Sequence, residues 1–432
     1  MSYLFHRHLA PITLIAIALL SACAPLTTTG DSATTPVVAL PPAAEQPTVA
    51  PTNASTPTTT QPAPIAVSPQ ITELPVQPTA LPSPTPTGQL GPTNFPPDVN
   101  PLTGLTVANP AALNRRPLLV KISNSPDCVR PQSGISQADL VFEHYAEGGT
   151  TRLTALFWTH DVSRIGSVRS ARLIDLELPA MYQALFAFSG ASDGLKRLIA
   201  ESDFFPYVLS PDYEPGHPGF YRRSIDEIRC ELVEHTLFTS TERLWANADL
   251  KNINQRPTVE GMVFNSAMPA GGQPGDELVV AYVGSYAYWG YSAADGRYYR
   301  TNNGGQHTDD LTGAPVTASN VVVLFVNHVT SDIIEDFVGY NPDTGQGGNY
   351  SVQIQLWGSG DALLFRDGQA YPIKWIRPER NRPFNLTDAA GNLIAMKPGT
   401  TWYQLVPLDT PTNTTAGSWE LRPPRPSPQP ES

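Results

Sequence analysis

The first strongly patterned part of the chain begins near residue 100, where apolar residues fall into short continuous runs. Residues 116–124 (RPLLVKISN) predict a buried strand. Residues 137–161 predict two further strands that meet at the Gly148-Gly149 turn. Between their turn residues, these runs have the length and β-branched content of strands in a packed core.

Two later segments of this region have helical spacing instead. Residues 173–183 predict a helix that Pro179 kinks or ends. Residues 192–202 (SDGLKRLIAES) predict a second helix, capped by Ser192 or Asp193. The mixture of strands and helices predicts an α/β domain over residues 97–250.

Beyond this region the pattern becomes that of consecutive strands and tight turns. Residues 320–329 (NVVVLFVNHV) predict a core strand, and hairpins are expected to turn at 294–296, at 367–368 and near 391–392. Residues 258–408 therefore predict a mainly antiparallel β domain. The fold class expected for the whole chain is mixed α+β.

The chain begins with a targeting segment rather than with part of the fold. An apolar run from Leu9 to Leu20 is too short for a membrane span, which needs about 20 residues, but suits the core of a signal peptide over residues 1–22. The run ends in Leu-Ser-Ala-Cys, which resembles the bacterial lipobox. This resemblance implies that Cys23 carries a lipid and anchors the mature protein to the outer face of the cell membrane.

Two segments have a composition that favours disorder. The chain contains 45 prolines, and residues 23–96 combine proline with threonine, alanine and serine but have hardly any charged or aromatic residues. Such a segment buries too little apolar surface to offset its conformational entropy, so we expect a disordered stalk. Residues 409–432 form a second, shorter Pro-rich tail.

The net charge of −12 limits the classes of partner. It disfavours nucleic acid, which requires a basic face, so any anion site must be a local pocket. The sequence has no Walker loop, HExxH or CxxC motif, and we expect no cofactor.

The best candidate binding residues surround the start of the first predicted helix. Arg169, Ser170 and Arg172 could hold a carboxylate or phosphate, with Arg152 as a further contact. The alternative is an internal ion pair with a nearby carboxylate: Glu143, Glu147 or Asp175.

Three acid–base candidates are weaker. Glu143 and Glu147 are spaced to share one face of a strand, where they could do acid–base work or serve as partners of the arginines. His235 could act as a general base, or its ring could satisfy a backbone carbonyl. We expected His217, in a Gly- and Pro-rich loop, to be exposed.

For two further groups of residues, we prefer a structural role to a binding role. His307, Asp309 and Asp310 could ligate a metal, but their spacing matches no strong signature and favours a turn, so we predict no metal site. A set of aromatic residues could stack on sugars, but suits cross-strand pairs and core better. This set is Tyr286, Tyr288, Trp289, Tyr291, Tyr298 and Tyr299.

Several blocks together resemble the YerB-like lipoprotein family, an extracytoplasmic family with N- and C-terminal domains. The opening block runs from RPLLVKISN to AEGGTTR. IGSVRSAR resembles the family motif Gly-Pro-Val/Ile-Arg-Ser-Ala-Arg, with Ser167 where proline is usual. FYRR…EHTLFTS resembles a Pro-His-Asn-Leu-Tyr-Thr-Ser block, with Glu234 and Thr236 replacing proline and asparagine. WGSGDALLFRDGQAYPIKW…GTTWYQLVP resembles the second domain.

The resemblance also brings two cysteines into consideration. Cys128 and Cys230 lie beside two separate family blocks, and the extracytoplasmic compartment permits oxidation. We expect them to form a disulfide, which would draw the opening block and the His235 block together.

The sequence thus predicts a lipid-anchored extracytoplasmic protein, with three functions left open. The leading one is a binding or accessory module for a small anion, a cell-wall glycan or an envelope protein. The alternative is a hydrolase or transferase acting on cell-wall polymer through the Glu and His candidates. A purely structural assembly partner is the third.

Overall fold

A computed structural model describes residues 88–344 and 347–426. The signal peptide, the lipidation candidate Cys23 and most of the stalk lie outside the described residues. The described residues are mostly strands with few helices, so the α/β character expected of residues 97–250 is weak. No described helix is long and apolar enough to cross a membrane. The α-helices are α1 (Leu178–Tyr182), α2 (Asp193–Ala200) and α3 (Thr241–Leu250).

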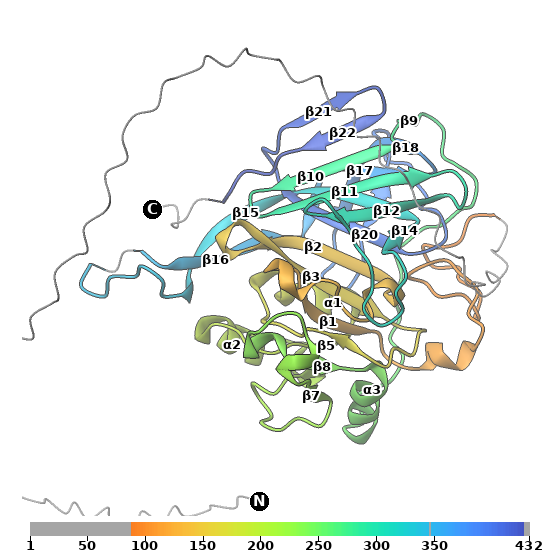
Figure 1. The fold of residues 1–432 in the computed structure, drawn as a ribbon. Coiled ribbons are helices and arrows are strands. Elements are labelled where there is room, and N and C mark those ends of the chain that lie inside the picture. The colour runs from red at the N-terminus through yellow and green to blue at the C-terminus, as the bar shows by residue number, and fades with distance from the viewer. Residues whose placement is uncertain (1–87, 345–346, 427–432) are drawn as a thin grey trace, which may run out of the picture. The chain divides into compact units, whose positions relative to one another are not determined.

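The largest sheet within the described residues has twelve strands (Figure 1). Its order is β19-β18-β17-β15-β20-β2-β3-β1-β5-β6, with β16 paired to β15 and β9 paired to β18. The strands from the first region are β1 (Leu118–Ser123), β2 (Leu140–Ala146), β3 (Thr150–Phe157), β5 (Leu185–Ala187) and β6 (Val208–Leu209). Those from the second are β9 (Gln273–Pro274), β15 (Asn320–Asp336), β16 (Asn349–Gln355), β17 (Gly358–Arg366), β18 (Gln369–Arg377), β19 (Asn385–Thr387) and β20 (Thr401–Pro407).

Strand β20 joins the two regions of the chain into this one sheet. It runs parallel to β15 on one side and to β2 on the other, with Leu140 opposite Thr401 and Glu143 opposite Gln404. All seven residues of β20 are buried, as is typical of a central parallel strand. The turn expected near residues 391–392 is present, since Thr387 bridges Leu393 in the antiparallel sense and Ile394 donates to the carbonyl of Leu386 at 2.8 Å. The expected hairpin does not extend into β20, which continues into the centre of the sheet.

A second sheet of seven described strands has the order β13-β12-β11-β10-β22-β21, with β14 paired to β12. Two of its strands lie in the predicted Pro-rich tail, where Trp419 and Leu421 are buried. Tyr291 pairs across the strands with Tyr298, and Trp289 is buried, as the alternation of aromatics indicated. The strands are β10 (Glu277–Tyr282), β11 (Ser285–Ser292), β12 (Arg297–Asn302), β13 (Gly305–Gln306), β14 (Thr317–Ala318), β21 (Thr412–Thr415) and β22 (Ser418–Leu421).

Side chains from the two faces of the large sheet belong to two separate hydrophobic clusters, because successive residues of a strand point to opposite faces. Trp402 and Val406 of β20 lie in the cluster that contains apolar residues of the second sheet. Tyr403 and Leu405 lie in the other, together with residues of α1 and α2. The large sheet is thus the middle layer between the second sheet and these helices.

Local structure around the first predicted helix differs in detail from the prediction. A 3₁₀ turn spans Leu173–Leu176, and α1 begins after Glu177 with Pro179 in its first turn, where proline is tolerated. A small third sheet lies nearby, formed by β4 (Ile165–Gly166), β7 (Phe220–Arg222) and β8 (Leu237–Thr239) in the order β4-β8-β7.

The boundary predicted at residue 96 is several residues too late. Leu90 is buried, and its backbone N–H donates to the carbonyl oxygen of Phe264 at 2.8 Å. The end of the predicted stalk therefore packs on the folded body.

Candidate functional site

The segment that carries the arginine motif lies along the end of β1. Strand β5 pairs only with the first half of β1, and the motif takes the place beside the second half. The N–H of Ser123 donates to the carbonyl of Ser167, and the N–H of Arg169 donates to that of Lys121, both at 3.0 Å. On its other side the carbonyl of Arg169 accepts from Ser189. The backbone of Arg169 is therefore fixed from two sides.

Arg172 is neutralised by internal carboxylates. Its Nε lies 2.5 Å from Glu147 and its Nη1 lies 2.8 Å from Glu335. Burial acts to lower the pKa of Arg172, but these two carboxylates raise it above its usual value. Its backbone N–H donates to Asp175, which occupies the start of the 3₁₀ turn in place of an external anion.

Arg152 and Arg169 differ from Arg172, because neither has a carboxylate within 4.0 Å among residues 88–344 and 347–426. Arg152 donates to the carbonyl of Ser170 at 3.2 Å, and Arg169 donates to that of Glu234 at 3.1 Å. The Nε of Arg169 is buried and has no hydrogen-bond partner in the part of the chain that the structure describes. Burial lowers the pKa of Arg152 to about 9, and the nearby charge of Arg172 adds to this shift. Burial also lowers the pKa of Arg169.

Ser170 does not cap a helix; instead its backbone carbonyl accepts a hydrogen bond and its side chain packs closely against Gly190. The N-cap of the 3₁₀ turn is Arg172, while the carbonyl of Ser170 orients Arg152. Its hydroxyl lies so close to Gly190 that a Cβ at that position would come within 2.6 Å of it. The hydrogen bond to the carbonyl of Ser170 helps to position Arg152.

Below the arginines lies a fully buried lysine that sequence reasoning missed. Lys121 Nζ lies 2.7 Å from Asp175 and 2.8 Å from both Nε2 of His144 and the hydroxyl of Thr154. Burial lowers the pKa of Lys121 to about 8, although Asp175 opposes the shift. The available signal was a single lysine inside an otherwise apolar predicted strand.

His235 lies beside the same arginines. It is 3% exposed, and its Nδ1 has no hydrogen-bond partner among the described residues. Burial, followed by the charge of Arg169, lowers the pKa of His235 to about 4, so the ring is neutral at physiological pH. His235 lines a cavity of about 120 Å³.

This cavity is bounded by the predicted disulfide, which is confirmed between Cys128 and Cys230. Ser167 also lines it, with a buried hydroxyl that has no hydrogen-bond partner in residues 88–344 and 347–426. The sequence showed Ser167 only as a departure from a family motif and gave no reason to place it with His235. His217, expected to be exposed, is buried and lines a different cavity of about 390 Å³.

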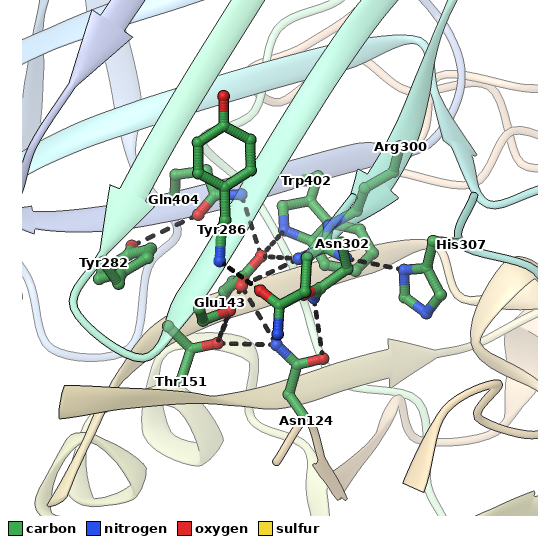
Figure 2. A network of polar contacts seen from close by, with 12 residues as sticks. Asn124, Glu143, Thr151, Tyr282, Tyr286, Arg300, Asn302, His307, Trp402 and Gln404 are labelled. Atoms are coloured by element: carbon green, nitrogen blue, oxygen red, sulfur yellow. Dashed lines mark hydrogen bonds and ion pairs between the residues drawn. The ribbon is translucent and has the colours of Figure 1, made fainter. Parts of the chain in front are cut away.

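Glu143 belongs to a separate network, shown in Figure 2, at the junction of the two sheets. Both of its oxygens accept from Nη2 of Arg300, at 2.8 and 3.0 Å. It also accepts from Trp402 at 3.1 Å, from Gln404 at 3.0 Å and from Thr151 at 2.9 Å. With no solvent exposure and its acceptor sites filled, this carboxylate is not a partner of Arg169 or Arg172 and has no access to a substrate.

The three weak metal candidates are tied to the protein's own groups. Nδ1 of His307 lies 2.8 Å from Nη1 of Arg300, Asp309 accepts three backbone N–H groups, and Asp310 pairs with Arg164 at 3.0 Å. Within the part of the chain that the structure describes, no group of three or more His, Cys, Asp or Glu side chains could hold a metal ion.

Two family models match the chain. Residues 102–254 match the N-terminal domain of the protein of unknown function DUF3048, and residues 278–403 match its C-terminal domain. The candidate lipoprotein YerB of Bacillus subtilis (strain 168) is 28% identical over 311 residues, which is 71% of this chain and 86% of the relative.

A solved structure agrees with these matches. The crystal structure of the YerB protein from Bacillus subtilis has a TM-score of 0.57 and 25% sequence identity, covering 72% of this chain and 97% of that chain. The chain belongs to the two-domain YerB-like family. Within the YerB-like fold, Arg152, Arg169, Arg172 and His235 all come from the N-terminal match, whereas Glu335 and Arg300 come from the C-terminal match.

Proposed function

We propose that this YerB-like protein is a lipid-anchored extracytoplasmic binding module that holds an anionic group of an envelope component between Arg152 and Arg169. One observation carries the proposal. Of three neighbouring arginines, Arg172 has two carboxylate partners, while Arg152 and Arg169 have none within 4.0 Å among the described residues.

Physical chemistry favours an anion at this position. A partly buried guanidinium loses hydration, and an ion pair or charge-assisted hydrogen bonds normally offset that loss. Each such bond contributes about 1.5–3 kcal/mol. The chain as a whole has a net charge of −12, so long-range attraction of anions is weak and the two arginines must act locally.

The cellular location rests on the N-terminal sequence and on the relative. The Leu-Ser-Ala-Cys stretch that ends at Cys23 supports a lipid anchor, and the matched Bacillus subtilis protein is named as a candidate lipoprotein. A ligand in this compartment would be a small anion, an acidic wall glycan or an acidic segment of an envelope protein.

The enzyme alternative depends on His235. Glu143 and Glu147 are both engaged by arginines, which leaves the neutral imidazole of His235 as the acid–base candidate. Its position beside the hydroxyl of Ser167 in one cavity supports this second reading. Release of soluble fragments from purified cell wall, abolished in His235→Gln, would favour it over pure binding.

The binding proposal is tested by thermal unfolding with phosphate, sulfate and acetate at low and high salt. We expect at least one anion to raise Tm, because a ligand of the folded state stabilises it by mass action. High salt should weaken the effect, and the Arg152→Ala/Arg169→Ala variant should abolish it. If no anion raises Tm, or if the variant responds like the parent protein, the proposal fails.

A further inference from the structure

The cavity that Ser167 and His235 line has the dimensions of a small binding site. Its volume is about 120 Å³, several times the ~30 Å³ that one water molecule occupies in the liquid. One wall is the Cys128–Cys230 disulfide, and Phe238 supplies an apolar surface. Arg223 also lines it but pairs internally with Glu227 and Asp310, each at 3.5 Å.

Two buried polar groups in this cavity have no partner within the described part of the chain. Ser167 is 4% exposed and His235 is 3% exposed, and both the hydroxyl of Ser167 and Nδ1 of His235 lack a hydrogen bond to any described residue. Buried polar atoms are nearly always bonded, so a pair of open ones in one cavity indicates a missing polar partner. A serine hydroxyl and a neutral imidazole suit an uncharged partner, such as a hydroxyl group.

Ser167 and His235, which line the cavity, each lie next in the chain to a segment that positions Arg169. Ser167 and Arg169 flank Val168, whose backbone bridges to Ile122 of β1, so they fall on the same side of an extended segment. His235 directly follows Glu234, whose carbonyl accepts from Arg169. The charges of Arg169 and Arg152 both contribute to the lowered pKa of His235.

We infer that Ser167 and His235 form a second subsite that binds a hydroxyl group of the ligand whose anionic group Arg152 and Arg169 hold. The ligand class is therefore a hydroxyl-bearing phosphate or carboxylate, such as a phosphorylated polyol or an acidic sugar. This inference rests on the proposed anion site and adds the substituent next to the anion.

Calorimetric titration of the full chain with methyl phosphate and with glycerol 3-phosphate tests the inference. The two probes share a phosphate monoester, and only the second carries hydroxyl groups. We expect glycerol 3-phosphate to bind about tenfold more tightly, since one or two neutral hydrogen bonds contribute about 0.5–1.5 kcal/mol each. Ser167→Ala should reduce this preference about threefold to tenfold. Ser163→Ala, a matched change at an exposed serine, should retain it.

The outcomes separate the two proposals. Equal affinities for the two probes, or a preference that survives both Ser167→Ala and His235→Ala, would overturn the second subsite but leave the anion site intact. Binding of neither probe would overturn the anion site as well. A preference that Ser167→Ala and His235→Ala each reduce would support both.

Discussion

The protein contains two clusters of buried charge that look alike in composition but differ in how completely they are paired. Around Glu143, one carboxylate faces one guanidinium, and neighbouring side chains fill its remaining acceptor positions (Figure 2). Around Arg169, the close carboxylates pair with Arg172 and Lys121, and the guanidiniums of Arg152 and Arg169 have none within 4.0 Å among the described residues.

This difference separates structure from function. The Glu143 cluster joins β2, β12 and β20, and so ties the second sheet to the large one. Its charges are compensated internally and have no need of a ligand. Within the described residues, the Arg169 cluster keeps two guanidiniums without a close carboxylate and buried polar atoms without a hydrogen bond, which an incoming anion can compensate.

The largest expected effect comes from breaking the ion pair between Glu143 and Arg300. Arg300→Met leaves Glu143 buried without its charge partner, and we expect a loss of about 3–5 kcal/mol in the free energy of unfolding. Urea unfolding measures this loss. Glu143→Gln removes the unpaired charge, so the double variant Glu143→Gln/Arg300→Met should recover part of the lost stability. An Arg300→Met variant as stable as the parent protein would contradict the account.

The Cys128–Cys230 disulfide forms one wall of the cavity that Ser167 and His235 line. Cys128 and Cys230 are 102 residues apart. The free energy of unfolding of the Cys128→Ala/Cys230→Ala variant should fall by about 2–4 kcal/mol, because the unfolded chain gains conformational freedom when this loop is no longer closed. Urea unfolding of the variant and of the oxidised parent gives the difference. An unchanged unfolding free energy would mean that the covalent link contributes nothing to the fold.

Within the arginine motif, Arg172 and Arg169 should behave in opposite ways. Arg172→Ala leaves Glu147 and Glu335 unpaired and should cost about 1–3 kcal/mol of stability. Arg169→Ala removes a group with no carboxylate partner within 4.0 Å in the described residues and should cost less than about 1 kcal/mol. Equal losses in the two variants, measured by urea unfolding without ligand, would remove the distinction between them.

The smallest expected effect is a pH dependence that includes His235. Its pKa is lowered to about 4 in the folded protein, whereas an unfolded histidine titrates near 6.5. Between these values the unfolded chain binds a proton that the folded chain does not, so stability falls as pH decreases from 6.5 toward 4. We expect His235→Asn to remove about 1 kcal/mol of the loss between pH 7.5 and 5.5. An identical loss in the variant would show that His235 does not contribute.

Local features of the fold were predictable from the sequence. The strands β1, β2 and β3 and the turns at 294–296 and 367–368 depend on neighbouring residues, and all were expected where they occur. The parallel placement of β20 between β15 and β2 was not predictable, because the turn signal at 391–392 is local and does not report which strands β20 joins beyond it.

The candidate site shows the same limit. The arginines and His235 could be identified from their residue types, but the division of partners among them could not. Arg172 is neutralised by Glu335, and Glu143 by Arg300 across 157 residues of sequence, and no local pattern reports such distances. Ser167 became a candidate binding residue only because the structure shows that it lines the same cavity as His235.

The most direct test of the central claim is the phosphate affinity of Arg169→Ala, measured by calorimetry beside the parent protein. The account predicts that affinity falls about tenfold to a hundredfold, because a charge-assisted hydrogen bond is lost, while the ligand-free variant remains folded. Phosphate binding of parental strength in Arg169→Ala would contradict the claim that the unpaired arginines are the anion site.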